Sequence, residues 1–219
     1  MRNDPHMTGT PVTYNVVIIT LDAHSMGPAQ QAAEALVGDY PGLCIDIHAA
    51  AQWGSDPQSF ERTKAAIATG DIIITNLLFL EDHVRPLVPL LQARRDSCDA
   101  MIGVICDASL VKLTKMGALD MGSPQSSTMS LLKRLRGSSK PGVESGAKKM
   151  RMLRRLPKIL KFIPGKAQDL RAWFLVMQYW MGGTDENIAA MLRFLLSRYC
   201  RMPQWQNRAA PEPKMYPEL

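Results

Sequence analysis

Short apolar runs alternate with helical patterns over the first half of the chain. Four runs rich in Val and Ile predict β-strands: 16–21 (VVIITL), 43–47 (LCIDI), 71–75 (DIIIT) and 100–106 (AMIGVIC). Helical patterns follow them at 28–37, 57–69, 81–95 and 109–116. Ser55 or Asp56 marks the start of the second of these helices, whereas Pro86 and Pro89 favour an irregular third.

Strands that are apolar on both faces and separated by helices are typical of a parallel sheet with helices on each side. The sequence therefore predicts an α/β fold with a doubly wound, mostly parallel sheet of the flavodoxin-like or Rossmann-like kind. A helical C-terminal segment is expected to follow it.

The pattern changes after residue 120. Helices are predicted at 124–136, 152–163, 166–181 and 184–199, with Thr184 as the cap of the last. The helix at 166–181 is apolar nearly all round, so the sheet or another surface must bury it. We expect a disordered N-terminus over 1–14, an α/β domain over 15–122, a helical segment over 123–200 with a basic linker at 137–150, and a truncated linker tail without secondary structure over 201–219.

Charge is distributed unevenly along the chain. The net charge is +6, but residues 133–166 hold twelve Lys or Arg against one acid, a net +11, which leaves −5 for the rest. A nucleic-acid-binding surface spread over the whole protein is therefore excluded, and we expect no nucleic-acid partner. With 46% hydrophobic and 21% charged residues, most of the chain has a globular composition.

The cysteines and the apolar segments favour a cytoplasmic protein. Cys44, Cys98, Cys106 and Cys200 are far apart without zinc-ligand spacing, so we expect reduced core cysteines. No secretory signal opens the chain, and the apolar run at 172–181 is shorter than the roughly 20 residues that span a bilayer.

Ionisable residues follow each predicted strand. In open α/β sheets, ligands bind beyond the carboxyl ends of the strands, so these side chains are candidates for a polar crevice that handles a cation or protons. The candidates are Asp22, His24, His48, Glu81, Asp82, His83 and Asp107. Polar residues at strand ends also serve simply as loop residues, and no histidine pair has the i, i+4 spacing of a helical metal site. The sequence therefore identifies no particular metal for this crevice. Glycine-rich phosphate loops and a GxSxG nucleophile elbow are absent from the sequence.

The basic amphipathic helix predicted at 152–163 is a candidate docking arm. Its cations are Arg151, Arg154, Arg155, Lys158 and Lys161. Such a helix can meet anionic lipid, dock on an acidic partner or contact nucleic acid, and it can also be a solvated face packed on an acidic neighbour. The nearby aromatic residues belong to apolar stripes, which favours packing over base stacking.

Four segments of the chain resemble the N-terminal region of the large (H) subunit of magnesium chelatases. They are VVIITLDAH (16–24), NLLFLEDHVRP with LLQARRDSCDAM (76–101), LLKRLRGSSK (131–140) and the segment from Met152 to Ile188. The resemblance runs from about Val16 to Tyr199. The last segment is long and of unusual composition, so it carries the most weight.

The resemblance implies a part of an enzyme that inserts Mg²⁺ into protoporphyrin IX in chlorophyll or bacteriochlorophyll synthesis. Separate I and D subunits would hydrolyse ATP, and the remainder of the H subunit would hold the porphyrin. H subunits are several times longer than this chain, so we expect a fragment that has no catalytic residue and binds no cofactor by itself. The alternatives are a fragment of the cobaltochelatase large subunit, or a non-enzymatic α/β module that docks a partner or, weakly, an anionic membrane through its basic helix.

Overall fold

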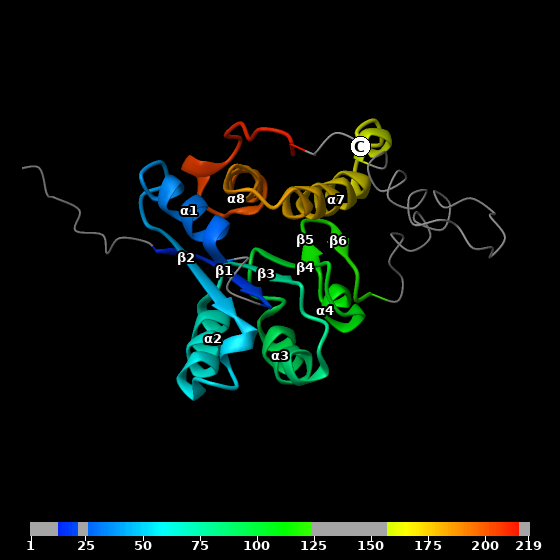
Figure 1. Cartoon of the computed structure of the whole chain (residues 1–219). Helices are drawn as coiled ribbons and strands as arrows, with labels where there is room; N and C mark the ends of the chain where they lie inside the picture. Colours follow the sequence, from blue (N-terminus) through cyan, green and yellow to red (C-terminus); the bar gives the residue numbers. More distant parts are fainter. Residues whose placement is uncertain (1–12, 22–25, 124–156, 215–219) are drawn as a thin grey trace, which may run out of the picture.

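The structure is a computed structural model that describes residues 13–21, 26–123 and 157–214. Within these residues, strands form a single sheet in the order β2-β1-β3-β4-β5-β6 (Figure 1). The strands are β1 (Tyr14–Thr20), β2 (Leu43–Ala49), β3 (Ile72–Asn76), β4 (Ala100–Val104), β5 (Lys115–Met116) and β6 (Leu119–Asp120). β1 to β4 are parallel, whereas β5 pairs antiparallel with β4, and β6 with β5. The predicted α/β class and mostly parallel sheet are confirmed, and the first four strands have the flavodoxin-like order.

Helices cover both faces of the sheet. On one face lie α1 (Met26–Val37), α7 (Lys166–Gly182) and α8 (Asp185–Tyr199), and on the other α2 (Pro57–Thr69), α3 (Glu81–Arg94) and α4 (Ala108–Lys112) (Figure 1). Alternate residues of β1 face the two layers, because successive strand side chains point to opposite faces. Val16 and Ile18 belong to the hydrophobic cluster of the first layer, and Val17 and Ile19 to that of the second.

Helix starts agree with the capping signals in the sequence. Asp56 accepts a hydrogen bond from the Gln58 N–H at 2.9 Å, and Thr184 accepts one from the Asn187 N–H at 3.2 Å. α3 continues through Pro86 and Pro89. Each proline removes a helix hydrogen bond, but buried residues such as Leu87 hold the helix on the sheet.

The helix predicted at 109–116 is wrong in its second half. α4 ends at Lys112, and the chain then forms a hairpin of β5 and β6 around a left-handed Gly117, with φ 55°. Met116 and Leu119 are buried on this hairpin, and Ala100 of β4 pairs with Met116. Two-residue strands carry no readable periodicity, so pairing with β4 decides the conformation.

α7 is buried against the sheet, as its all-round apolar pattern requires. The Trp173 indole N–H donates to the Gly103 carbonyl oxygen in β4 at 3.0 Å. Asp169 accepts from the Ala118 N–H at 2.8 Å and from the Tyr199 hydroxyl at 2.8 Å, which connects α7 to the β5–β6 turn and to α8. No helix in the described part of the chain is long and apolar enough to cross a membrane.

Residues after α8 pack on the domain, in contrast to the expected tail without secondary structure. A 3-10 turn, η2 (Pro203–Trp205), places the Trp205 ring against Tyr14 and Tyr40, with ring centroids 5.5 and 5.4 Å apart. Trp205 is 1% exposed. Further along, the Asn187 side chain exchanges two 2.9 Å hydrogen bonds with the backbone of Lys214. Burial of the Trp205 indole and the two Asn187–Lys214 hydrogen bonds hold residues 203–214 against the domain.

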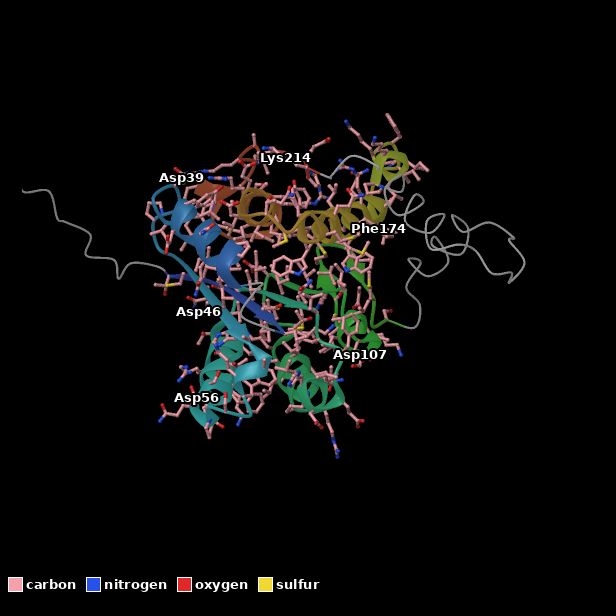
Figure 2. The ribbon with its side chains drawn as sticks, viewed as in Figure 1. Asp39, Asp46, Asp56, Asp107, Phe174 and Lys214 are labelled. Atoms are coloured by element: carbon pink, nitrogen blue, oxygen red, sulfur yellow. The ribbon has the colours of Figure 1, made fainter. Side chains whose placement is uncertain are left out.

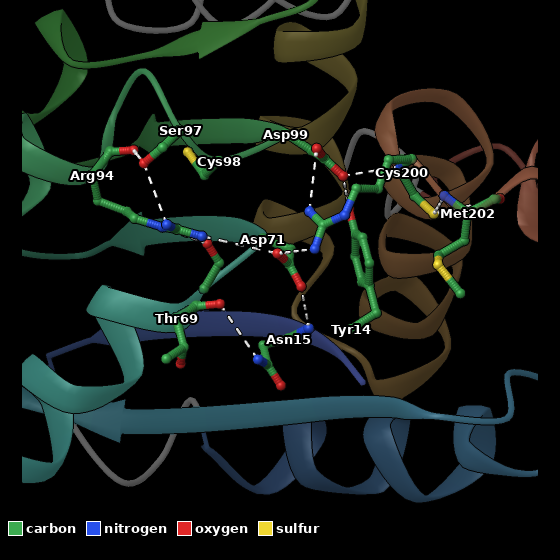
Figure 3. Close-up of polar contacts among 12 residues, drawn as sticks. Tyr14, Asn15, Thr69, Asp71, Arg94, Ser97, Cys98, Asp99, Cys200 and Met202 are labelled. Atoms are coloured by element: carbon green, nitrogen blue, oxygen red, sulfur yellow. Dashed lines mark hydrogen bonds and ion pairs between the residues drawn. The ribbon is translucent and has the colours of Figure 1, made fainter. Parts of the chain in front are cut away.

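A polar cluster at the amino ends of the strands holds the same segment (Figure 3). The Arg201 guanidinium lies 2.7 Å from the Asp71 carboxylate, which also accepts the Asn15 N–H at 2.8 Å. Asp99 accepts the Tyr14 hydroxyl at 2.7 Å and the Arg201 N–H at 2.9 Å. Burial, followed by the hydrogen bond to Asp99, raises the pKa of Tyr14, so this hydroxyl stays a donor. We call Tyr14, Asp71, Asp99 and Arg201 the Asp71–Arg201 cluster.

The cysteines are all free, and only some lie in the core. Cys106 and Cys200 are buried, as expected for core cysteines, whereas Cys98 is only partly buried against the second-layer cluster. Cys44 is exposed, so the expectation that it lies in the core is wrong. It lies on β2, which is an edge strand of the sheet that the described residues form.

Candidate functional site

The sheet's carboxyl edge, where β1 to β4 end, carries the candidate polar residues. Asp22 and His24 lie outside the described residues. Glu81 and Asp82 are exposed in the first turn of α3, where their charges complement the helix N-terminus. His83 follows them, with its ring edge-on to Trp53 at 5.7 Å between centroids.

Asp107 has a defined structural role. It is the N-cap of α4 and accepts from the Ser109 N–H at 2.8 Å and from the Ser109 hydroxyl at 2.6 Å. These hydrogen bonds lower the pKa of the Asp107 carboxyl. Figure 2 shows Asp107 beside α3 and α4. It lines a hollow with Glu81, so the structure brings these two candidates together.

His48 is the last residue but one of β2 and is half-buried. Burial lowers the pKa of its imidazole, with a smaller lowering from Arg62 and an opposing effect of Asp46. Figure 2 shows Asp46 on β2. The Nε2 atom of His48 has no hydrogen-bond partner among the residues described. Burial thus disfavours the protonated imidazole in the folded protein.

This burial predicts a pH-dependent stability. Unfolded His48 takes up a proton near pH 6.5, whereas the folded imidazole resists it, so stability present above pH 6.5 is lost as the pH falls toward the lower folded pKa. We expect the urea midpoint to fall between about pH 7.5 and about pH 5.5, and to fall less in His48→Gln. An equal decrease of the urea midpoint in the two proteins would show that His48 does not contribute to the pH dependence of stability.

Buried polar atoms without partners gather near this edge. In the described part of the chain they are Thr20 Oγ1, His48 Nε2, Trp53 Nε1, Asn76 Oδ1 and His83 Nδ1. Thr20, His48 and Asn76 end or nearly end β1, β2 and β3, and the other two residues follow β2 and β3. Unpaired buried polar atoms are available to water or a ligand. Nonetheless, no group of three or more His, Cys, Asp or Glu side chains suited to a metal ion occurs in the described ranges.

Apolar residues at this edge form a feature that the sequence reasoning missed. Phe79 and Leu80, in the loop between β3 and α3, are 57% and 58% exposed. The segment NLLFL directly after an apolar strand was the available signal, but its alternation of buried and exposed positions depends on the loop conformation. This edge is therefore polar in part and apolar in part.

The described end of the basic arm lies by the start of α7. Lys158 and Lys161 are exposed and line a hollow with Arg171. Two apolar side chains next to these lysines are also exposed: Ile159 is 51% exposed and Phe162, directly after Lys161, is 84% exposed. Arg151, Arg154 and Arg155 lie outside the described residues, as do the helix predicted at 124–136 and the basic linker.

Comparison with known proteins gives one family and several close relatives. The family described as "Domain of unknown function (DUF3479)" matches residues 15–174. The magnesium-chelatase H subunit of Cereibacter sphaeroides is 54% identical over 211 residues, which are 96% of this chain and 18% of that protein. The corresponding H subunit of Rhodobacter capsulatus is 50% identical over 215 residues, 98% of this chain and 18% of that protein.

A plant relative is more distant. The chloroplastic magnesium-chelatase ChlH subunit of Oryza sativa subsp. japonica is 28% identical over 148 residues, 66% of this chain and 10% of that protein. The chain thus spans less than a fifth of the length of its bacterial relatives. The predicted resemblance is confirmed over nearly the whole chain. The chain belongs to the DUF3479 family and is related to the N-terminal region of magnesium-chelatase H subunits.

Proposed function

We propose that the chain works as the N-terminal domain of the H subunit of a cytoplasmic magnesium chelatase. The assembled enzyme inserts Mg²⁺ into protoporphyrin IX, and its I and D subunits hydrolyse ATP. The observation that carries the proposal is the 54% identity with the H subunit of Cereibacter sphaeroides over 96% of this chain. Neither the cobaltochelatase fragment nor the independent docking module is favoured by these relatives.

Within that enzyme the domain acts as a head that helps enclose the substrate or contacts partner subunits. Asp107 caps a helix, and Glu81 and Asp82 are solvated, so these carboxylates support a binding role rather than proton transfer. The exposed Lys158 and Lys161 suit an acidic partner surface.

A chimeric subunit tests the proposal. Residues 1–219 of this chain replace the matching region of the Cereibacter sphaeroides H subunit, and magnesium insertion into protoporphyrin IX is measured with that organism's I and D subunits and ATP. We expect a rate within about tenfold of the natural subunit, since the fold and most contacts are retained. The matched control lacks the region, and we expect its rate to fall by more than about tenfold.

Two outcomes would contradict the proposal. One is a chimera that is folded by circular dichroism but as inactive as the control without the domain. The other is a control that keeps the full rate, because the domain would then have no part in the reaction. Porphyrin binding to the chimera, followed by absorption, separates loss of substrate binding from loss of partner coupling.

A further inference from the structure

The loop between β3 and α3 presents apolar side chains to solvent from a fixed base. Leu78 is fully buried in the second-layer cluster and anchors the loop. Its neighbours Phe79 and Leu80 project outward, 57% and 58% exposed. Two adjacent large apolar side chains that remain this exposed beside a buried anchor form the centre of a candidate interaction surface.

Hydrogen bonds between the residues that follow β3 and those that follow β4 hold this loop in place. The Leu77 N–H donates to the Ile105 carbonyl oxygen at 2.9 Å, and the Asp107 N–H donates to the Leu78 carbonyl oxygen at 2.8 Å. Leu77 and Ile105 both have left-handed backbones, with φ 56° and 50°. This conformation is unfavourable for a β-branched residue such as Ile105. The loop is thus kept in one strained shape by contacts between the ends of β3 and β4.

Hollows lie on both sides of the loop. One, of about 380 Å³, is lined by Leu77, Ile105 and the end of α7, including Trp180 and Met181. The other, of about 500 Å³, is lined by Phe79 together with Val84, Val88 and Pro89 of α3. The loop forms a ridge between two partly apolar grooves, which we call the loop ridge (residues 77–80).

Acidic residues line one side of the loop ridge. Glu81 and Asp107 line the second hollow, where Arg85 is the one cation among the described lining residues. Asp82 is exposed beside Glu81, so three carboxylates on this side stand against two cations, Arg85 and Lys112, of which Lys112 lies close enough to Asp107 to lower its pKa. The apolar centre with an acidic rim matches an amphipathic helix that carries basic residues along its flank.

We propose that the loop ridge is the docking site for such a basic amphipathic helix in the part of the H subunit outside this domain. The proposal rests on the function proposed above, and on the relatives' length, of which this chain matches 18%. An anionic membrane fits poorly, because the acidic rim would be repelled by its lipid headgroups. Two copies related by a twofold axis would likewise place two acidic rims against each other.

Photo-crosslinking in the chimeric subunit tests the docking. Phe79 is replaced by p-benzoylphenylalanine, an aromatic residue of related shape, and the matched control carries it at Val37, which is similarly exposed at 55% on α1. After irradiation, crosslinked peptides are identified by mass spectrometry. We expect position 79 to crosslink within the same chain to a peptide outside residues 1–219, and position 37 not to reach that peptide.

Charge reversal tests the rim. Glu81→Lys with Asp82→Lys should reduce the yield of the position 79 crosslink by about tenfold, while Glu61→Lys, an exposed change on α2, should leave it unchanged. Crosslinks to a second copy, to the I or D subunit alone, or to nothing would overturn the proposal, as would an unchanged yield after charge reversal. The crosslink does not depend on turnover. An active chimera that lacks the position 79 crosslink contradicts only the docking proposal. An inactive chimera that forms the crosslink contradicts only the proposed function.

Discussion

Asp71→Ala is expected to lower the free energy of unfolding by about 2 kcal/mol, because it removes a buried carboxylate that accepts hydrogen bonds from a backbone N–H and from a half-exposed guanidinium. The Asp71 side chain is 3% exposed, and it receives the Arg201 guanidinium at 2.7 Å and the Asn15 N–H at 2.8 Å. Arg94 lies 3.9 Å away as a second cation. Without the carboxylate the part-buried Asn15 N–H loses its acceptor, whereas the Arg201 guanidinium, which is 50% exposed, can turn to water.

Urea unfolding followed by circular dichroism measures this effect. Asp71→Asn keeps the shape and an acceptor oxygen but removes the charge, so we expect a smaller loss than in Asp71→Ala. Glu61→Ala removes a carboxylate from an exposed pair with Lys64 and should cost less than about 0.5 kcal/mol. If Asp71→Ala and Glu61→Ala had the same stability, the Asp71–Arg201 cluster would contribute little to holding the fold.

Trp205→Ala should destabilise the domain by about 3 to 5 kcal/mol, the range for truncating a buried aromatic side chain. The indole is 1% exposed and packs edge-on against Tyr14 and Tyr40. Its loss leaves a cavity between β1, the turn after α1 and the segment after α8. Tyr14 also belongs to the Asp71–Arg201 cluster. We therefore expect Trp205→Ala to weaken the hydrogen bonds of that cluster as well.

The matched control for Trp205 is Val37→Ala, which truncates an apolar side chain that is 55% exposed. We expect the control to change the urea midpoint little, and Trp205→Phe to recover part of the stability by refilling the space. A Trp205→Ala protein with the midpoint of the unmodified chain would show that residues 201–214 are not part of the cooperative unit.

Patterns in the sequence were sufficient for the main elements of the fold. Runs such as Ile72–Ile74 are apolar on both faces and predict central parallel strands, and the structure buries all three side chains. Caps at Asp56 and Thr184 were readable because each acts on backbone two or three residues away. The β5–β6 hairpin was missed, because its strands are two residues long and depend on pairing with β4.

The candidate site was predictable only by position along the chain. The strand ends do place His48, Glu81, His83 and Asp107 at or beyond one edge of the sheet, since parallel strands end together. Which side chains face one another depends on loop conformation. Asp107 therefore caps α4, whereas Phe79 and Leu80 lie exposed on the loop ridge.

The α/β class, the positions of the main strands and helices, the uneven charge and the relation to magnesium-chelatase H subunits can all be read from the amino-acid sequence alone. These properties depend on local periodicity, on composition or on residue-by-residue similarity. The Asp71–Arg201 cluster, the burial of Trp205 and the loop ridge become visible only in the folded chain. Each depends on contacts between segments distant in sequence, such as Asp99 with Arg201, 102 residues apart, and no local pattern encodes which distant groups will meet.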